Sequence, residues 1–276
     1  MKLFDKVCII GVGLIGGSVA LGFKKNKLCR ILVGVSRSRR SILLAKKRKA
    51  IDSGSQDISL VKDADLVVLA TPVMTTLKLA PLISRMIKKN CIVIDVGSTK
   101  KDVVMKLDRI FPEYIGTHPL AGSEKRGVTA ASASIFKDSV CILTPTKNTK
   151  TKTLAKIKKM WIELGAKIVV MPAGAHDKTL ALLSHLPHVV AFSLIRSIPE
   201  AYLRLAPNSL KDMTRIAASE SELWSDIFLS NKENIIRSIK SFQTQLDSLR
   251  LSLNKEDRVS LVRILKNAKT RRQNLE

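Results

Sequence analysis

A histidine and a serine occur in two small-residue segments that follow strand-like runs of the sequence. Residues 94–100 read Ile-Asp-Val-Gly-Ser-Thr-Lys and contain Ser98, and residues 116–127 read Gly-Thr-His-Pro-Leu-Ala-Gly-Ser-Glu-Lys-Arg-Gly and contain His118. Ligands bind at the carboxyl edge of a parallel sheet, so we expect both side chains there. An imidazole, with an ordinary pKa of about 6.5, accepts a proton from an alcohol while hydride leaves the same carbon. We predict His118 as that base and Ser98 as the partner that fixes its tautomer. The alternative for His118, taken alone, is a structural loop histidine.

A glycine-rich turn near the N-terminus has the spacing of a dinucleotide-binding site. The pattern Gly-x-Gly-x-x-Gly at Gly11, Gly13 and Gly16 lies between an apolar run and a helical pattern. The first glycine allows a tight turn, the second lets the backbone approach a pyrophosphate, and the third allows close packing of helix and strand. The alternative is a glycine-rich turn without a ligand, but the flanking strand and helix favour a cofactor. The residues expected to contact it are Gly11, Gly13, Leu14, Ile15, Gly16, Ser36, Arg37 and Thr71.

The end of the second strand-like run bears on the choice between NAD and NADP. An NAD enzyme usually has Asp or Glu at this point to hold the ribose 2′-hydroxyl, whereas this chain has Ser36 followed by Arg37. The missing carboxylate removes repulsion of a 2′-phosphate, and a guanidinium offers a planar fork to bind one. The sequence therefore favours NADP, or use of both cofactors. The alternative is that Arg37 is an exposed arginine at the start of a helix.

The apolar runs and helical stretches of the first part of the chain alternate. Strands rich in Val and Ile that alternate with helices indicate a doubly wound, mainly parallel α/β sheet of Rossmann type, covered on both faces. We assign it to a dinucleotide-binding domain, residues 1–172. The predicted strands are residues 7–11, 31–35, 66–70, 92–96, 114–116, 140–143 and 168–171.

Residues 173–276 show no further strand pattern and are predicted as an all-helical C-terminal domain for substrate binding and dimerisation. Its helices are expected to break at Pro187, Pro199 and Pro207. Residues 231–253 form a long amphipathic pattern, which needs a partner surface in the chain or on a second copy and makes a homodimer plausible. The last dozen residues are basic and polar, and we expect them to fray.

Composition excludes several classes of protein. Hydrophobic residues make up 45% of the 276, which excludes general disorder, and no apolar run reaches the roughly 18 residues of a membrane span. The N-terminus lacks a signal-peptide pattern, so we expect a cytoplasmic protein. The four cysteines suit buried small side chains, and the four histidines show no metal-ligand spacing. We interpret the net charge of +25 mainly as solvated, lysine-rich helix faces, and attraction of anionic ligands is the alternative. Only 4% of residues are aromatic, so we do not expect nucleic acid as a partner.

Five strings of the sequence resemble those of the prephenate/arogenate dehydrogenases, the enzymes of tyrosine biosynthesis. They are GVGLIGGS, DVGSTK, HPLAGSEKRG, SHLPH and DMTRIA, and the resemblance runs from residue 6 to about 229. It implies oxidative decarboxylation of prephenate to 4-hydroxyphenylpyruvate, or of arogenate to tyrosine, with hydride transfer to NAD(P). It also implies that His118 bonds the ring hydroxyl, that Ser98 orients His118, and that no metal is needed. The substrate-binding residues that it implies are Arg215, which grips a carboxylate, and His188, Glu124, Asp212, Trp224 and Ser123.

Several of these residues also have ordinary structural explanations. Asp212 and Arg215 could be a surface pair three residues apart on a helix, and Trp224 could be a core residue. For His185 we favour packing, and His176 with Asp177 suits capping or lining of the cleft equally well.

Two other functions compete with the oxidative decarboxylase. One is a dehydrogenase or reductase of the β-hydroxyacid or imine class, but such enzymes commonly use a helical lysine, and we find no comparable site. The other is a redox-sensing or nucleic-acid-binding protein, motivated by the charge. We also expect no appended regulatory domain in a chain of 276 residues.

Overall fold

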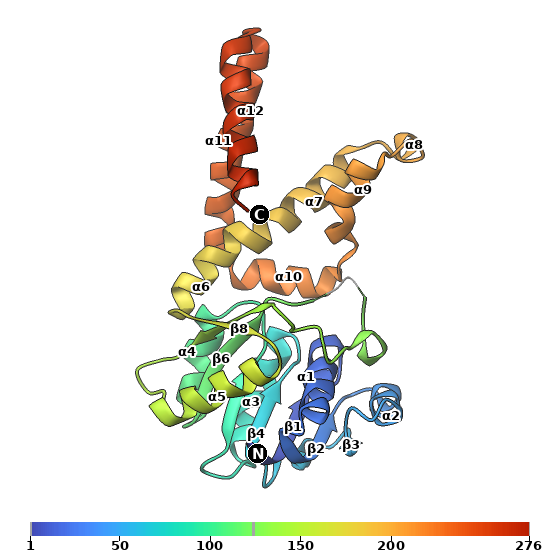
Figure 1. Cartoon of the computed structure of the whole chain (residues 1–276), viewed down its shortest axis with the longest axis vertical. Helices are drawn as coiled ribbons and strands as arrows, with labels where there is room; N and C mark the ends of the chain where they lie inside the picture. Colours follow the sequence, from blue (N-terminus) through green and yellow to red (C-terminus); the bar gives the residue numbers. More distant parts are fainter. Residues whose placement is uncertain (1, 123–124, 276) are drawn as a thin grey trace.

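The computed structural model describes residues 2–122 and 125–275 and contains one eight-stranded sheet (Figure 1). The strand order is β3-β2-β1-β4-β5-β6-β7-β8, so the order reverses between β1 and β4. Neighbouring strands are parallel except for β6 and β7, which are antiparallel. The strands are β1 (Phe4–Ile10), β2 (Cys29–Val35), β3 (Ser53–Ser55), β4 (Leu66–Leu69), β5 (Ile92–Asp95), β6 (Tyr114–Pro119), β7 (Val140–Thr144) and β8 (Lys167–Val170).

Helices cover both faces of the sheet, because alternate residues of its central strands are apolar and buried on opposite sides. In β1, Val7 and Ile9 belong to one core, and Cys8 and Ile10 to the other. The first core includes α1 (Leu14–Lys25), α2 (Arg39–Lys47) and α5 (Thr151–Glu163), and the second includes α3 (Val73–Ser84) and α4 (Lys101–Ile110). Short 3-10 turns, η1 (Ile58–Val61) and η2 (Val128–Ala130), complete the connections.

The predicted Rossmann-type fold class is confirmed, and all seven predicted strands are present. The prediction missed β3, because its sequence Ser-Gly-Ser has no apolar character and the strand lies at the edge of the sheet. It also ended β6 at Gly116, three residues too early. His118 is therefore inside the sheet, paired with Ile142 of β7, rather than in the loop that follows.

The second part of the chain is helical throughout its described residues, but one predicted break is wrong. Pro187 is the second residue of α7 (Leu186–Ser197), and it follows a π-helical turn without ending the helix. The π-helical turn η3 (Ala181–His185) joins α7 to α6 (Ala173–Leu180), so residues Ala173–Ser197 form one continuous helix. The remaining helices are α8 (Glu200–Leu203), α9 (Asn208–Thr214), η4 (Arg215–Ala218), α10 (Ser221–Ser230), α11 (Lys232–Asn254) and α12 (Arg258–Gln273).

The continuous helix is apolar enough, by length and composition alone, to cross a membrane. The search for long apolar runs in the sequence did not reveal it, because polar residues are spread along it. Core helices of proteins without a membrane share this property, and this helix carries His176 and Asp177 buried against the sheet domain. The division into domains 1–172 and 173–276 stays a prediction; β8 ends at Val170 and α6 begins at Ala173.

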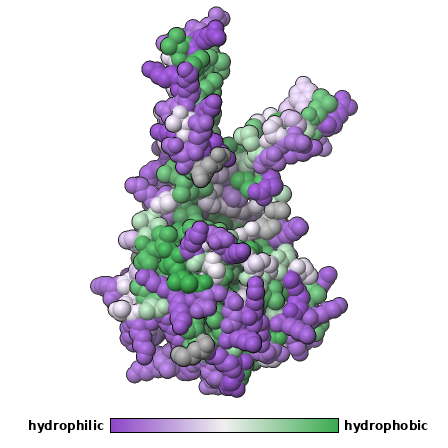
Figure 2. Space-filling model, in the orientation of Figure 1, coloured by the Kyte–Doolittle hydropathy of each residue, from purple (hydrophilic) through white to green (hydrophobic). Residues whose placement is uncertain are grey.

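Two helical arms project away from the sheet in Figure 1, one made of α11 and α12 and one of α7, α8 and α9. The long helix predicted at residues 231–253 is confirmed, whereas the tail expected to fray is helical up to Gln273. Most of α11 is exposed after its first turns, with Ser252 as a buried exception: Ile235 is 4% exposed, while Leu246 is 49% exposed and Leu253 62%. Hydrophobic side chains accordingly reach the surface among hydrophilic ones along this arm (Figure 2).

Candidate active site

The turn between β1 and α1 has the backbone geometry that a dinucleotide requires. Gly11 has φ +97°, and a Cβ there would lie 2.5 Å from the carbonyl oxygen of Ala70. A Cβ on Gly16 would lie 2.0 Å from the carbonyl oxygen of Gly11, so this position holds helix and strand together. A Cβ on Gly13 meets nothing within 4 Å among the described residues, which leaves its backbone open to a ligand at the start of α1.

Three cavities run along the carboxyl edge of the sheet. The first, about 880 Å³, is lined by Gly11, Gly13, Ser36, Arg37 and Thr71 among others. The second, about 450 Å³, shares Gly13 and Thr71 with the first and extends to Ser98 and Trp224. The third, about 510 Å³, shares Ser98 and Trp224 with the second. Because neighbours share lining residues, the three form one continuous cleft.

The predicted cofactor residues lie along this cleft, with one exception. Leu14 and Ile15 line the second and third cavities, and the other predicted residues line the first or second. Gly16 is buried and lines none of them, so its contribution is to packing. An ion pair between Arg126 and Glu220 joins the loop after β6 to the start of α10 across the second cavity.

The third cavity brings together most of the predicted catalytic and substrate residues. It is lined by Ser98, His118, His188, Arg215 and Trp224. Asp212 is exposed and lies outside this lining, so the structure does not place it with the substrate residues. Ser123 and Glu124 lie outside the described residues.

His118 has a different hydrogen-bond partner from the predicted one. Its Nδ1 lies 2.8 Å from Nε2 of His176, whose Nδ1 lies 2.7 Å from Oδ1 of Asp177. Among the described residues no hydrogen bond joins Ser98 to His118, and His176 is the partner of His118 Nδ1 instead. The reason is spatial, since α6 brings His176 against β6 although the two histidines are 58 residues apart.

The chain of three side chains fixes both tautomers. A carboxylate only accepts hydrogen bonds, so His176 donates its Nδ1–H to Asp177 and keeps a lone pair on Nε2. That lone pair accepts the Nδ1–H of His118, which leaves the neutral His118 with its own lone pair on Nε2. The Nε2 nitrogen of His118 is therefore the basic atom.

Burial and neighbouring charges keep this pair of histidines neutral. Burial, His176, Lys100 and His185 hold the pKa of His118 well below its ordinary value. Burial also lowers the pKa of His176, although the hydrogen bond to Asp177 opposes it. Burial alone would raise the pKa of Asp177, but hydrogen bonds from His176 and from the backbone of α4 hold it below its ordinary value.

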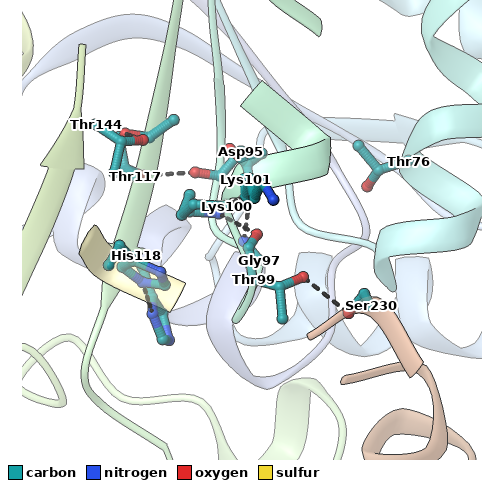
Figure 3. Close-up of polar contacts among 12 residues, drawn as sticks. Thr76, Asp95, Gly97, Thr99, Lys100, Lys101, Thr117, His118, Thr144 and Ser230 are labelled. Carbon is teal, nitrogen blue, oxygen red and sulfur yellow. Dashed lines mark hydrogen bonds and ion pairs between the residues drawn. The ribbon is translucent and has the colours of Figure 1, made fainter. Parts of the chain in front are cut away.

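The loop that carries Ser98 is fixed from both sides. The Asp95 carboxylate accepts a hydrogen bond from the backbone N–H of Gly97 (2.8 Å), and its backbone carbonyl accepts one from Thr117 (2.5 Å). On the helical side, Ser230 of α10 donates to Thr99 at 3.0 Å (Figure 3). Ser98 is thus held at the junction of the second and third cavities.

His188 and Trp224 form one wall of the third cavity. Their rings stack with centroids 3.4 Å apart and an interplanar angle of 22°. His188 donates its Nδ1–H to the carbonyl of Ser184 (3.0 Å), which leaves Nε2 as an acceptor. Burial lowers the pKa of His188, so this acceptor is neutral.

The π-turn of the long helix explains why His176 and His188 reach the same cleft. They are twelve residues apart, and an uninterrupted α-helix would point them about 120° away from each other. A π-turn inserts one extra residue, which reduces this angle to roughly 20°. No residue pattern indicates the π-turn, and only the adjacent His176-Asp177 pair suggested a further histidine in the cleft.

The fold and the cleft define a protein of the dinucleotide-binding class, with a Rossmann-type sheet followed by a helical part. Two family models match it: residues 19–170 match the nucleotide-binding domain of prephenate dehydrogenase, and residues 172–267 match its dimerization domain. The chain therefore belongs to the prephenate dehydrogenase family.

Individual relatives cover nearly the whole chain. The prephenate dehydrogenase of Bacillus subtilis is 36% identical, and the alignment spans 99% of this chain and 77% of that protein. The cyclohexadienyl dehydrogenase of Zymomonas mobilis is also 36% identical, over 93% of this chain and 91% of that protein. A crystal structure of prephenate dehydrogenase from A. aeolicus in complex with hydroxyphenyl propionate and NAD+ has a TM-score of 0.94 at 35% identity, and covers 99% of this chain and 98% of that one.

Two glycine variants separate packing from ligand binding in the nucleotide turn. Gly16→Ala places a methyl group against the carbonyl of Gly11, so we expect the free energy of unfolding to fall by roughly 2 kcal/mol or more. Gly13→Ala is the matched control, because its methyl group meets only open space. It should unfold within about 0.5 kcal/mol of wild type but bind NAD(P) at least about tenfold more weakly. Chemical denaturation measures the free energy of unfolding, and fluorescence titration with NADPH measures the cofactor affinity. Equal stability of the two variants would contradict the assignment of Gly16 to packing and Gly13 to ligand binding.

Proposed function

We propose that the chain catalyses the oxidative decarboxylation of prephenate to 4-hydroxyphenylpyruvate with a nicotinamide cofactor, in tyrosine biosynthesis. The observation that carries the proposal is the position of His118, which lines the cavity that joins the nucleotide turn to Arg215 and has its lone pair on Nε2. The sequence identity to prephenate dehydrogenases over nearly the whole chain supports the same substrate.

The turn at Gly11, Gly13 and Gly16 fits a dinucleotide, since it combines an open backbone at the start of a helix with close helix–strand packing. Ser36, Arg37 and Thr71 would hold the adenosine half, and Leu14 and Ile15 would line the path towards Ser98. When bound, the nicotinamide supplies the acceptor for the hydride of the substrate's carbinol carbon.

His118 takes the proton of the ring hydroxyl on Nε2 while hydride leaves the carbinol carbon. The resulting dienone loses its ring carboxylate as carbon dioxide, and the electron pair of the broken bond makes the ring aromatic and leaves a phenolate oxygen. The imidazolium of His118 then returns the proton to that oxygen. Ser98, at the same cavity, is proposed to hydrogen-bond the reacting oxygen directly.

The other end of the cavity is proposed to hold the substrate's side chain. Arg215 lies in its lining and offers a guanidinium fork to a carboxylate. Trp224 and His188 supply a flat wall against the side chain. Asp212 lies outside the lining of this cavity. It stays a proposed substrate residue, with Ser123 and Glu124, on the family resemblance alone.

Arogenate is the second candidate substrate. It carries an ammonium group in place of the keto group of prephenate, and the neutral Nε2 of His188 accepts a hydrogen bond from such a donor. The cyclohexadienyl dehydrogenase among the relatives is compatible with either substrate.

The direct test is the reaction itself. Purified protein should convert prephenate to 4-hydroxyphenylpyruvate with one reduced cofactor formed per turnover, followed by absorbance at 340 nm. His118→Asn should lower kcat by roughly 10²–10⁴-fold, because the base is removed, while NADPH affinity stays within about twofold. Undiminished turnover in this variant would refute the assignment of His118, and wild-type turnover of neither prephenate nor arogenate would refute the proposed function.

The proposed role of His176 is to orient His118, and the pH profile tests it. Because the pKa of His118 is lowered, kcat/KM of the wild type should stay high as pH falls to 6.5 and decline only below it. Burial is the main cause of the lowered pKa of His118 and His176 adds to it, so His176→Gln should move the acidic limb to higher pH and lower kcat by roughly 10²-fold. Cofactor KM should not change. A lower kcat with an unmoved limb would mean that His176 is only structural.

NADP is the proposed cofactor, although the A. aeolicus relative was solved with NAD+. Ser36, Arg37 and Ser38 line the adenosine cavity, and its one acidic residue among the described ones, Asp57, is engaged by the backbone and hydroxyl of Ser59. Arg37→Gln should raise the KM for NADP by about tenfold and leave that for NAD unchanged. Arg40→Gln, in the same basic run but outside the lining, is the control. A wild-type preference for NAD would refute this proposal.

The helical arms are proposed to pair with a second copy of the chain in a cytoplasmic homodimer. The match to a dimerization domain and the exposed apolar side chains Leu246, Leu253 and Leu265 support the pairing. Sedimentation velocity that shows a monomer at micromolar concentration would contradict it.

A further inference from the structure

Lys100, the residue before α4, is buried without any exposed surface. Its Nζ lies 2.5 Å from Oδ2 of Asp95 and 3.2 Å from the carbonyl oxygen of Thr99 (Figure 3). Asp95 is 2% exposed and also accepts the hydroxyl of Tyr114 at 2.6 Å. A buried ion pair is expensive to form and is often replaceable by apolar side chains without loss of stability, so its presence calls for a reason other than packing.

The ion pair lies directly behind the two histidines. A Cβ on Gly116 would lie 3.2 Å from Cδ of Lys100, so the lysine stem runs along that face of β6. Gly116 and His118 are two residues apart in the strand and therefore project to the same face. The backbone N–H of Lys100 donates to Oδ1 of Asp177, the same oxygen that accepts the hydrogen bond of His176.

We propose that Lys100 is a positioning residue of the active site, whose buried ammonium, held by Asp95, keeps the His118–His176 pair uncharged so that Nε2 of His118 is free to accept a proton. The inference rests on the proposed function for its benefit to catalysis, but the electrostatic effect itself does not depend on turnover.

A positive charge opposes protonation of a nearby imidazole, and burial strengthens the effect because little water screens it. Burial is the largest cause of the lowered pKa of both histidines; Lys100 adds to it in each, after His176 in the case of His118. At His176, Asp177 and Asp95 act in the opposite direction. The ammonium thus opposes protonation of both histidines, so Nε2 of His118 keeps its lone pair until the substrate binds. The titratable and charged groups that face His118 are His176 and Asp177 on α6, His185 on η3, Lys100 and Asp95 on the β5–α4 segment, Cys141 on β7, and His188 and Arg215 across the cavity.

The chain has four histidines, so its imidazoles can be titrated individually by NMR after labelling with ¹⁵N-histidine. The His118 signal is identified by its loss in His118→Asn. Lys100→Met removes the buried charge and keeps the stem, and should raise the titration midpoint of His118 by about half a pH unit or more. Lys101→Met is the matched control: it removes an adjacent but exposed lysine, whose charge water screens, and should move the midpoint by less than about 0.2 unit.

The acidic limb of kcat/KM should move with the NMR midpoint in Lys100→Met. If that variant does not fold, as judged by thermal melting, Lys100→Gln keeps a hydrogen-bond donor for Asp95 and should give the same upward shift. A His118 midpoint that is unchanged or lowered in a folded variant would overturn the inference. The NMR shift without prephenate turnover would refute the proposed function alone, whereas turnover with an unshifted midpoint would refute this inference alone.

Discussion

The Asp177 carboxylate is the contact on which the arrangement of the cleft depends. Its two oxygens accept the backbone N–H groups of Lys100 (2.8 Å) and Lys101 (2.9 Å) at the start of α4, where a negative charge is stabilised by the helix dipole. One of them also accepts the hydrogen bond of His176, and the backbone carbonyl of Asp177 accepts one from Asn231 (2.8 Å). One buried side chain therefore docks the helical part on the sheet and orders the histidines at the same time.

A second constraint on the cleft is that its charge must suit anionic ligands. Both proposed ligands are anionic, and Arg37, Arg126 and Arg215 lie along its lining from the adenosine end to the substrate end. The net charge of +25 adds a long-range attraction for such ligands that falls with ionic strength. His118 must be unprotonated to accept a proton from the proposed substrate. Burial keeps both histidines neutral, because it lowers their pKa.

Local sequence patterns predicted those features that depend on neighbours in the chain. The glycine spacing and the Val- and Ile-rich runs are local, and they led to the nucleotide turn, seven strands and the fold class. Features that depend on contacts distant in sequence were missed or misassigned. The partner of His118 is 58 residues away, and β3 has no apolar residue and is defined only by pairing with β2.

Pro187 shows that a local pattern can also predict a feature that the structure does not have. A break at Pro187 is the local expectation, but the helix continues through the π-turn that precedes this proline. The family resemblance supplied residues such as Arg215 and Trp224 that no pattern alone could assign to a pocket. It did not supply the hydrogen bonds among them, which depend on the packing of α6 against α4 and β6.

His118 belongs to the sheet, whereas His176 and His188 belong to one rigid helix of the other part of the molecule. Separation of the two parts would leave His176 and His188 at a fixed distance from each other but would take both away from His118. The imidazole would then be solvated, free to rotate, and as readily protonated as any surface histidine. Closure of the cleft is thus what orients the imidazole of His118 through His176 and buries it, which lowers its pKa.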